Sequence, residues 1–541
     1  MTSTIQILVL LLAVVAAVAI IANRLKIPAS IPLVLTGVLL ALVPGLPPVE
    51  LAPEVVLLLV LPPIIYTSAF QMNWREFRFN LRPITLLSVG GVAFTALAVA
   101  AAAHWLMNLS WPVGFVLGAI ISPPDAIAPL SIARRMQIPR RILVVLEGEA
   151  LANDATALIL YRFAVAAVSL GVFSLVEAAG TFAAIFVGEI LWGIGVGWVM
   201  LRLRRWVDEP LIEILLSILT PFLAFWPPEH LGGSGVLATV TAGLYTSWNG
   251  PRLISPATRL QGIFFWDFFS YAIEGMIFVI TGLQARTVLS RIGHYPVSQL
   301  VISVAVITAV ITIARFVWIF PATYLPRWLF APIRRKDPSP PWQWPFVLSF
   351  TGVRGIVSLA AALAIPFATA TGEPFPDRDL ILFLTFAVIL MTLVGQGLTL
   401  PWVLRRLGLA HTGRREREVH RAEEYAARSA GIKAAIKLLD ELAAERELAT
   451  DVVEAARAQH LDRLQHIEDG TSGDGDAKKH GEVHDEVERL LIAAERDQIN
   501  DLFRDGKLND EARRRIEREL DMRVARLPKP SSTPDADTLK T

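Results

Sequence analysis

The sequence contains no cysteine, and only 18% of its residues are charged. Without cysteine the chain has no disulfide, no thiolate metal ligand and no thiol nucleophile. A soluble protein usually carries about 25% charged residues, so the low charge argues against most soluble classes. The formal net charge of +1 also lacks the basic excess of a nucleic-acid-binding protein, and we expect no nucleic-acid partner.

The charge that is present divides the chain into two parts. The first 409 residues carry 26 Lys and Arg and 19 Asp and Glu, for a net charge of +7. The remaining 132 residues carry 24 and 30, for a net charge of −6. These figures predict a transmembrane domain over residues 1–409, a cytosolic and mainly helical domain over residues 410–527, and a disordered tail over residues 528–541.

Long apolar runs fill the first part. A helix needs about 17 to 25 apolar residues to cross a hydrocarbon core of about 30 Å. The run at residues 232–248 is the weakest candidate, because three glycines lie near its start. We predict an all-α membrane protein, surrounded by lipid, with about 13 transmembrane helices near residues 5–22, 31–45, 54–70, 83–106, 112–132, 140–170, 180–203, 210–226, 232–248, 261–284, 297–326, 344–370 and 379–408.

Basic residues set the orientation, because short cytoplasmic loops retain Arg and Lys. If the N-terminus is outside, the inward loops carry 18 Arg and Lys, and the outward loops carry only Arg286, Arg291 and Arg378. This bias predicts an odd number of spans in the cell membrane and a cytoplasmic C-terminal domain. The first run has no basic residue before it, so we interpret it as a retained helix rather than a signal peptide.

Three spans are expected to carry a charged side chain to a similar depth. At about 1.5 Å per residue, Asp125 lies roughly 21 Å from the outer end of the fifth span. Asp154 lies about 20 Å, and Arg354 about 15 Å, from the inner ends of the sixth and twelfth spans. A charged group at such depth is costly, so each of them needs a partner or a function.

Two of these three spans also contain helix breakers. Ser122-Pro-Pro-Asp125 interrupts the fifth span and Thr351-Gly-Val-Arg-Gly355 interrupts the twelfth. Broken helices are tolerated in a membrane only where the freed backbone groups are buried in protein or line a cavity. A chain of six, one and six spans would place the two at equivalent positions of six-helix inverted repeats, crossing at the midplane.

The sixth span supplies a titrating group. Glu149 and Asn153 are four residues apart and share a helix face, and Asp154 follows directly. Asp154 has no cation close by in sequence, so its carboxylate can exchange a proton for a metal cation near physiological pH. If the sixth and twelfth spans touch, Arg354 can keep Glu149 ionised. One acidic site that is open alternately to either side would give electroneutral antiport.

Three motifs in these spans make the chain resemble the monovalent cation:proton antiporters of the bacterial sodium/proton exchanger type, which are related to the eukaryotic sodium/hydrogen exchangers. The motifs are Ser122-Pro-Pro-Asp-Ala-Ile-Ala128, Leu146-Glu-Gly-Glu-Ala-Leu-Ala-Asn-Asp-Ala-Thr-Ala-Leu158 and Gly352-Val-Arg-Gly-Ile-Val-Ser-Leu359. The resemblance covers roughly residues 5–408.

The resemblance implies roles for individual residues. Asn153 and Asp154 correspond to the pair that marks electroneutral exchangers, in which the aspartate binds the cation or the proton. Glu149 and Arg354 correspond to a structural ion pair. Members of the family are homodimers that exchange Na⁺, and in some cases K⁺ or Li⁺, for H⁺, and the resemblance implies no cofactor besides the transported ions.

The chain departs from the family pattern at three positions that supply oxygen atoms. Pro124 replaces a threonine of the common Thr-Asp-Pro motif, Ala150 replaces a serine, and Thr67 stands where some members have a glutamate. A small hard cation needs several oxygen ligands. We expect Asp125, Ser122, Thr67, backbone carbonyls or water to complete the set, and K⁺ remains an alternative to Na⁺.

Other interpretations stay open at this stage. Asp125 is as well suited to cap the broken helix ends as to bind the cation. A cation channel or sensor regulated by the cytosolic tail is a less favoured alternative, because a channel needs a continuous polar path. No His-Glu-x-x-His motif and no protease constellation supports an intramembrane enzyme. The partner of the C-terminal domain is not identified by the sequence.

Overall fold

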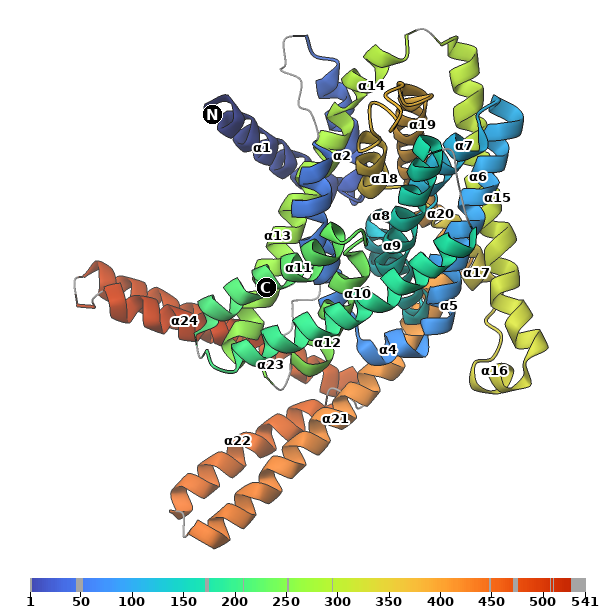
Figure 1. The fold of residues 1–541 in the computed structure, drawn as a ribbon. Helices are drawn as coiled ribbons and strands as arrows, with labels where there is room; N and C mark the ends of the chain where they lie inside the picture. The colour runs from blue at the N-terminus through green and yellow to red at the C-terminus, as the bar shows by residue number, and fades with distance from the viewer. Residues whose placement is uncertain are drawn as a thin grey trace. The chain divides into compact units, whose positions relative to one another are not determined.

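The computed structural model describes residues 2–44, 52–170, 175–207, 209–250, 253–293, 295–446, 449–469, 475–505, 507–508 and 510–526. Within these ranges the chain is helical (Figure 1), and the only β-pairing is an isolated bridge between Ala368 and Pro374. The predicted disordered tail, residues 528–541, lies outside the described residues.

The chain forms two compact units that divide between Arg414 and Arg415. This division falls inside helix α21 (Leu409–Arg446), five residues after the predicted domain border. The second unit consists of the rest of α21 and of α22 (Thr450–Asp469), α23 (Gly475–Arg504) and α24 (Asp510–Arg526). Inside this unit, Arg496 and Arg523 of α23 and α24 form ion pairs with Asp521 and Glu495, so charged side chains join the two helices.

Every predicted apolar run of the first unit contains helix. Three short helices, α4 (Trp74–Phe79), α14 (Ala285–Arg291) and α16 (Ala331–Lys336), lie in the connections and were not predicted. Three stretches are π-helical and carry the label η. The elements that correspond to the runs are α1 (Thr2–Leu25), α2 (Ser30–Ala41), η1 (Val55–Val60), α3 (Leu61–Gln71), α5 (Leu81–Thr85), η2 (Leu86–Gly91), α6 (Val92–Met107), α7 (Trp111–Ile121), α8 (Ile127–Met136), α9 (Arg140–Leu170), α10 (Leu175–Arg204), α11 (Pro210–His230), α12 (Val236–Asn249), α13 (Pro256–Leu283), α15 (Val297–Leu329), α17 (Gln343–Phe350), α18 (Ile356–Leu363), α19 (Arg378–Leu390), η4 (Met391–Gln396) and α20 (Gly397–Arg406).

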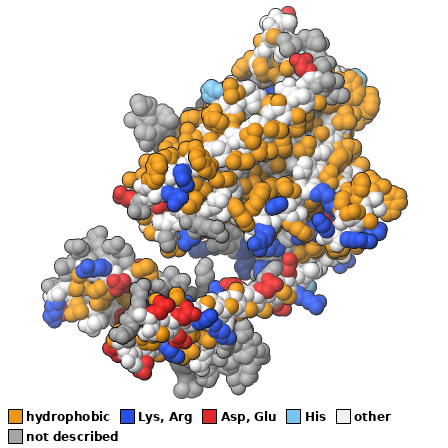
Figure 2. Space-filling view, turned by 60° about the horizontal axis from the view of Figure 1, so that its bottom comes forward, with side chains coloured by type: hydrophobic (Ala, Val, Ile, Leu, Met, Phe, Trp, Pro, Cys, Tyr) orange, Lys and Arg blue, Asp and Glu red, His pale blue; other side chains and the backbone are white. Residues whose placement is uncertain are grey.

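The flanks of the first unit are apolar. Among the described residues, six helical stretches are long and apolar enough to cross a membrane by length and composition. Their outward side chains include Leu191, Val301 and Ile302, which are all more than half exposed. Figure 2 shows apolar side chains covering the flank, with Lys and Arg gathered along its border. This surface is that of an integral membrane protein, because lipid tails are the solvent in which exposed apolar side chains are stable.

Small residues allow the helices of the first unit to pack closely. A Cβ atom on Gly37 of α2 would lie 2.2 Å from the carbonyl oxygen of Val279 on α13, and one on Gly282 would lie 2.2 Å from that of Val34. The α6–α7 pair meets in the same way, at Gly118 and Ala96. Close backbone approach through small residues is the usual basis of helix packing in membranes, where no hydrophobic effect drives association.

The Gly37→Ala variant is expected to be destabilised by about 1–3 kcal/mol, because the new methyl group would overlap a backbone carbonyl that cannot rotate away. The measurement is the thermal unfolding midpoint of the purified protein in detergent. Gly195→Ala on α10 is the matched control, because a Cβ atom there would meet no atom within 4 Å. Equal midpoints for the two variants would contradict the close helix crossing.

Helix α12 begins four residues later than the predicted run. Gly232 and Gly235 have positive φ angles of 89° and 67°, so the chain turns before the helix begins at Val236. The carboxylate of Glu189 on α10, 3% exposed, accepts hydrogen bonds from the backbone N–H groups of Ser234, Gly235 and Leu237 at 2.6–3.0 Å. A negative charge at a helix N-terminus is favourable, so this buried carboxylate stabilises the start of α12.

Candidate functional site

The two predicted helix breaks are present and contact each other. Residues 122–126 separate α7 from α8, and residues 351–355 separate α17 from α18. The backbone N–H of Asp125 donates to the carbonyl oxygen of Val353 at 2.7 Å. The backbone groups freed by the prolines and glycines therefore bind partly to one another, which satisfies them inside the protein.

Asp125 lies at the start of both following half-helices. Its Oδ1 accepts a hydrogen bond from the backbone N–H of Ile127, at the start of α8, at 2.9 Å. A Cβ atom on Gly355, which precedes α18, would lie only 1.9 Å from Oδ2 of Asp125. The carboxylate thus faces the positive ends of α8 and α18, which supports the capping interpretation of this residue.

Arg354 covers the opposite ends of the broken helices. Its guanidinium, 1% exposed, donates to the carbonyl oxygens of Ile121, the last residue of α7, and of Gly352, just after α17. Its backbone N–H donates to the hydroxyl of Thr392 in η4 at 3.0 Å. A cation at helix C-termini complements the partial negative charge of their carbonyls. At the crossing, the carboxylate of Asp125 therefore lies at helix N-termini and the guanidinium of Arg354 lies at helix C-termini.

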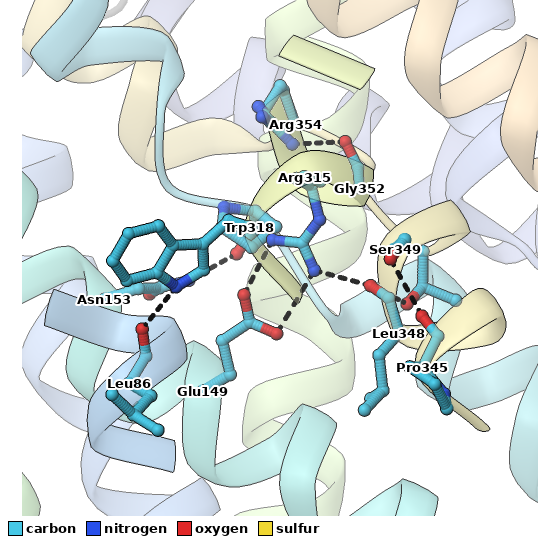
Figure 3. Close-up of polar contacts among 12 residues, drawn as sticks. Leu86, Glu149, Asn153, Arg315, Trp318, Pro345, Leu348, Ser349, Gly352 and Arg354 are labelled. Atoms are coloured by element: carbon cyan, nitrogen blue, oxygen red, sulfur yellow. Dashed lines mark hydrogen bonds and ion pairs between the residues drawn. The ribbon is translucent and has the colours of Figure 1, made fainter. Parts of the chain in front are cut away.

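The predicted ion pair between Glu149 and Arg354 is wrong. Figure 3 shows Glu149 of α9 facing Arg315 of α15, with Oε1 2.7 Å from Nη1 and Oε2 3.2 Å from Nη2. Arg315 also donates to the carbonyl oxygen of Leu348 in α17 at 2.7 Å. Both side chains of the pair are buried, with exposed fractions of 7% and 3%. Arg354 instead binds the backbone carbonyls at the crossing, so the two arginines have different partners.

Arg315 could have been identified from its depth. It lies 18 residues after Val297, and a rise of about 1.5 Å per residue puts it roughly 27 Å from the outer end of its span. Glu149 lies about 12 Å from the inner end of the sixth span by the same count, so both belong to the inner half of the membrane. The sequence alone does not show that α9 and α15 are neighbours, so it does not single out Arg315 as the partner of Glu149.

Asn153 connects α9 to the fifth-span break. Its Nδ2 donates to the carbonyl oxygen of Pro124 at 2.7 Å, and its side chain is fully buried. Its Oδ1 has no hydrogen-bond partner among the described residues. A buried amide oxygen without a partner is costly and is available to a cation.

Asp154 follows on α9 and is partly buried. Its carboxylate is close enough to that of Asp125 for electrostatic interaction, and it has no hydrogen bond or ion pair to any residue that the structure describes. Asp154 has no cationic partner and lies near a second carboxylate, that of Asp125, so the negative charges of the two side chains are not neutralised. A proton or a metal cation would supply the missing positive charge.

The two predicted hydroxyl ligands bind their own helices. Ser122 is buried in the fifth-span break, and its Oγ donates to the carbonyl oxygen of Ala119 at 3.2 Å. Thr67 is buried on α3, and its Oγ1 donates to the carbonyl oxygen of Pro63 at 2.8 Å. Each oxygen keeps lone pairs for a cation. Their participation in ion binding remains a prediction.

Broken helices that cross beside a partly buried, unpaired carboxylate are typical of an ion-coupled membrane transporter. Residues 9–406 match the family model of the transmembrane sodium/hydrogen exchangers. The chain belongs to this sodium/hydrogen exchanger family. It is a cation/proton antiporter and not an enzyme.

Individual relatives agree with this assignment. The chain is 35% identical to an uncharacterized Na⁺/H⁺ exchanger of Mycobacterium tuberculosis, over 97% of each chain. It is 34% identical to a sodium, potassium, lithium and rubidium/H⁺ antiporter of Bacillus subtilis, over 73% of this chain and 60% of that protein. The solved structure of the sodium proton antiporter MjNhaP1 from Methanocaldococcus jannaschii is 20% identical in sequence and matches with a TM-score of 0.58. The match covers 75% of this chain and 99% of that one, so the two proteins share the fold.

Adding a methyl group at the crossing tests its geometry. The Gly355→Ala variant is expected to lose antiport activity by about 10²-fold, because the new Cβ would displace the Asp125 carboxylate, and a shift of about 1 Å can cost that much. The backbone of Gly355 is extended and suits any residue, so space is the only obstacle. The measurement is cation-dependent proton flux in vesicles. Gly395→Ala in η4, where a Cβ atom meets nothing within 4 Å, should keep wild-type flux, and equal flux in both variants would contradict the contact.

Proposed function

We propose that the protein exchanges Na⁺, or K⁺ or Li⁺, for H⁺ by alternating access, with the cation and the proton competing for Asp154. The observation that carries the proposal is the unpaired Asp154 carboxylate beside Asp125 and the free Oδ1 of Asn153. One carboxylate that alternately binds one proton and one monovalent cation moves no net charge in a full cycle. Electroneutral exchange follows from this count.

The remaining oxygen atoms give the site an adaptable ligand set. Ser122, Thr67 and backbone carbonyls of the breaks would complete the coordination of the cation, together with water. Such a set does not fix one cavity size, which favours acceptance of more than one alkali cation. The relative from Bacillus subtilis, whose name includes four alkali cations, supports the same breadth.

The fold supports a topology for this activity. We propose thirteen spans in two inverted six-helix repeats, with the N-terminus outside and the second unit, α21–α24, in the cytoplasm. The resemblance to homodimeric antiporters supports a homodimer in the cell membrane. The partner of the second unit remains to be identified.

The experiment is fluorescence-monitored ΔpH in everted vesicles, with Na⁺, Li⁺ or K⁺ added in separate runs and then in competition. Cation-dependent dissipation of ΔpH by the wild type is expected, and its absence for all three cations would overturn antiport. The competition series ranks the cations.

Electroneutrality needs a separate measurement, because ΔpH does not report charge. Reconstituted protein in K⁺-free buffer, with equal Na⁺ and equal pH on both sides, should show no proton flux when a gradient of the permeant anion thiocyanate imposes a membrane potential. A potential-driven flux would show that cations and protons are not exchanged one for one.

A further inference from the structure

Three arginines meet around one aspartate at an end of the helices, away from Asp154. Arg82 at the start of α5, Arg141 at the start of α9 and Arg327 at the end of α15 each lie 2.7–2.8 Å from a carboxylate oxygen of Asp337. Asp337 follows α16 directly. Three guanidinium charges against one carboxylate leave an excess of about two positive charges in this cluster.

The same arginines line a half-open pocket. It is open to solvent, and a set of mainly apolar residues completes its wall. Arg327 is 4% exposed at its side chain, whereas Arg82 and Arg141 are 27% and 24% exposed. Arg327 is thus buried in the wall of the pocket, whereas Arg82 and Arg141 are partly exposed to solvent. The apolar members of the lining are Pro83, Ile142, Val145, Ala322, Pro340, Trp344, Pro345 and Leu348.

Donor groups remain in two of the arginines. Arg327 is fully engaged, because Nε, Nη1 and Nη2 donate to the Asp337 backbone, to Thr323 and to the Asp337 carboxylate. Arg82 uses only Nη2, and Arg141 uses Nη2 for Asp337 and Nε for Asn80. Nε and Nη1 of Arg82 and Nη1 of Arg141 have no acceptor among the residues that the structure describes. Such a fork of free N–H groups matches the oxygen atoms of a phosphate.

We propose that this pocket binds the phosphate of an anionic phospholipid from the membrane leaflet that faces it. Arg82 and Arg327 lie in the first or last turn of long apolar stretches, where headgroups are found, and Arg141 lies in the first turn of α9 beside them. The apolar wall suits the start of an acyl chain. The proposed orientation makes this the cytoplasmic leaflet, and the inference rests on that orientation. The bound lipid would join α5, α9 and α15 by supplying the negative charge that Asp337 alone does not.

The test measures the unfolding midpoint of the full-length protein in detergent with added phosphatidylglycerol or phosphatidylcholine. Phosphatidylglycerol is expected to raise the midpoint by several degrees more than phosphatidylcholine does, and native mass spectrometry should show retained phosphatidylglycerol. Arg82→Gln should remove most of the difference, because it deletes the free Nε and Nη1 donors of Arg82 while Arg141 and Arg327 still hold Asp337. Arg78→Gln, an exposed arginine on α4, is the control and should keep the difference.

Three outcomes would overturn the proposal. An equal effect of both lipids on the wild type, which needs no variant to fold, would exclude an anionic lipid site. A full phosphatidylglycerol effect in Arg82→Gln would place the lipid elsewhere. Inorganic phosphate is tested against chloride at equal ionic strength. If phosphate without lipid raises the unfolding midpoint as much as phosphatidylglycerol does, the pocket binds a free anion and the lipid is excluded. None of these readouts uses ion transport, so they are independent of the antiport proposal.

Discussion

Replacing Asp154 with asparagine is expected to reduce cation-dependent proton flux to the background of empty vesicles, a loss of at least about 10²-fold. Asparagine keeps the size of the side chain but can neither bind a proton nor carry a negative charge. Because the carboxylate has no described hydrogen-bond or ion-pair partner, the substitution breaks no contact that the structure shows and should not lower the unfolding midpoint. The measurement is ΔpH in everted vesicles with matched protein amounts.

Glu147→Gln is the matched control for this prediction. Glu147 is on the same helix, about two turns before Asn153 and Asp154, but it forms a partly exposed ion pair with Arg134. A pair of this kind contributes only about 0–1 kcal/mol, so the control should keep its flux. Flux retained by Asp154→Asn would remove Asp154 from the mechanism.

Replacing Arg315 with glutamine is expected to destabilise the protein by about 3–5 kcal/mol, the usual effect of leaving one buried charge without its partner. Glu149 would keep its charge with no described cation bound to it. The double variant Glu149→Gln/Arg315→Gln should recover a large part of this loss, because the unpaired charge is removed. Unfolding midpoints of the four proteins in detergent form the double-mutant cycle.

Arg354 provides the comparison, because the sequence predicted it to be the partner of Glu149. Its guanidinium binds carbonyls of Ile121 and Gly352, so Arg354→Gln should be destabilising but should not be rescued by Glu149→Gln. Strong coupling of Glu149 to Arg354 and none to Arg315 would show that the pair found in the structure is not the one that stabilises the protein.

The sequence predicted most of the elements of the first unit but not all of their contacts. Apolar runs marked the helices because burial in lipid requires uninterrupted hydrophobicity, and Pro123, Pro124, Gly352 and Gly355 marked both breaks because they act on their own local backbone. The start of α12 was misplaced by four residues, because Gly232 and Gly235 adopt positive φ angles and the helix begins only after them.

Partner choice was the part that sequence spacing could not resolve. Two arginines, Arg315 and Arg354, were deep enough to reach Glu149, and a count of residues along each helix gives depth but not the direction in which a side chain points. Only the packing of α9 against its neighbours separates the two. The same limit applies to Asp337, whose three arginines come from three separate helices.

The hydrogen bonds of Glu189 have a consequence for how two helices can move. Three of the groups that donate to this carboxylate are backbone N–H groups, which have no rotamers to change. Such a contact follows the backbone of the partner helix, so α10 and the start of α12 must shift together in any rearrangement of the first unit.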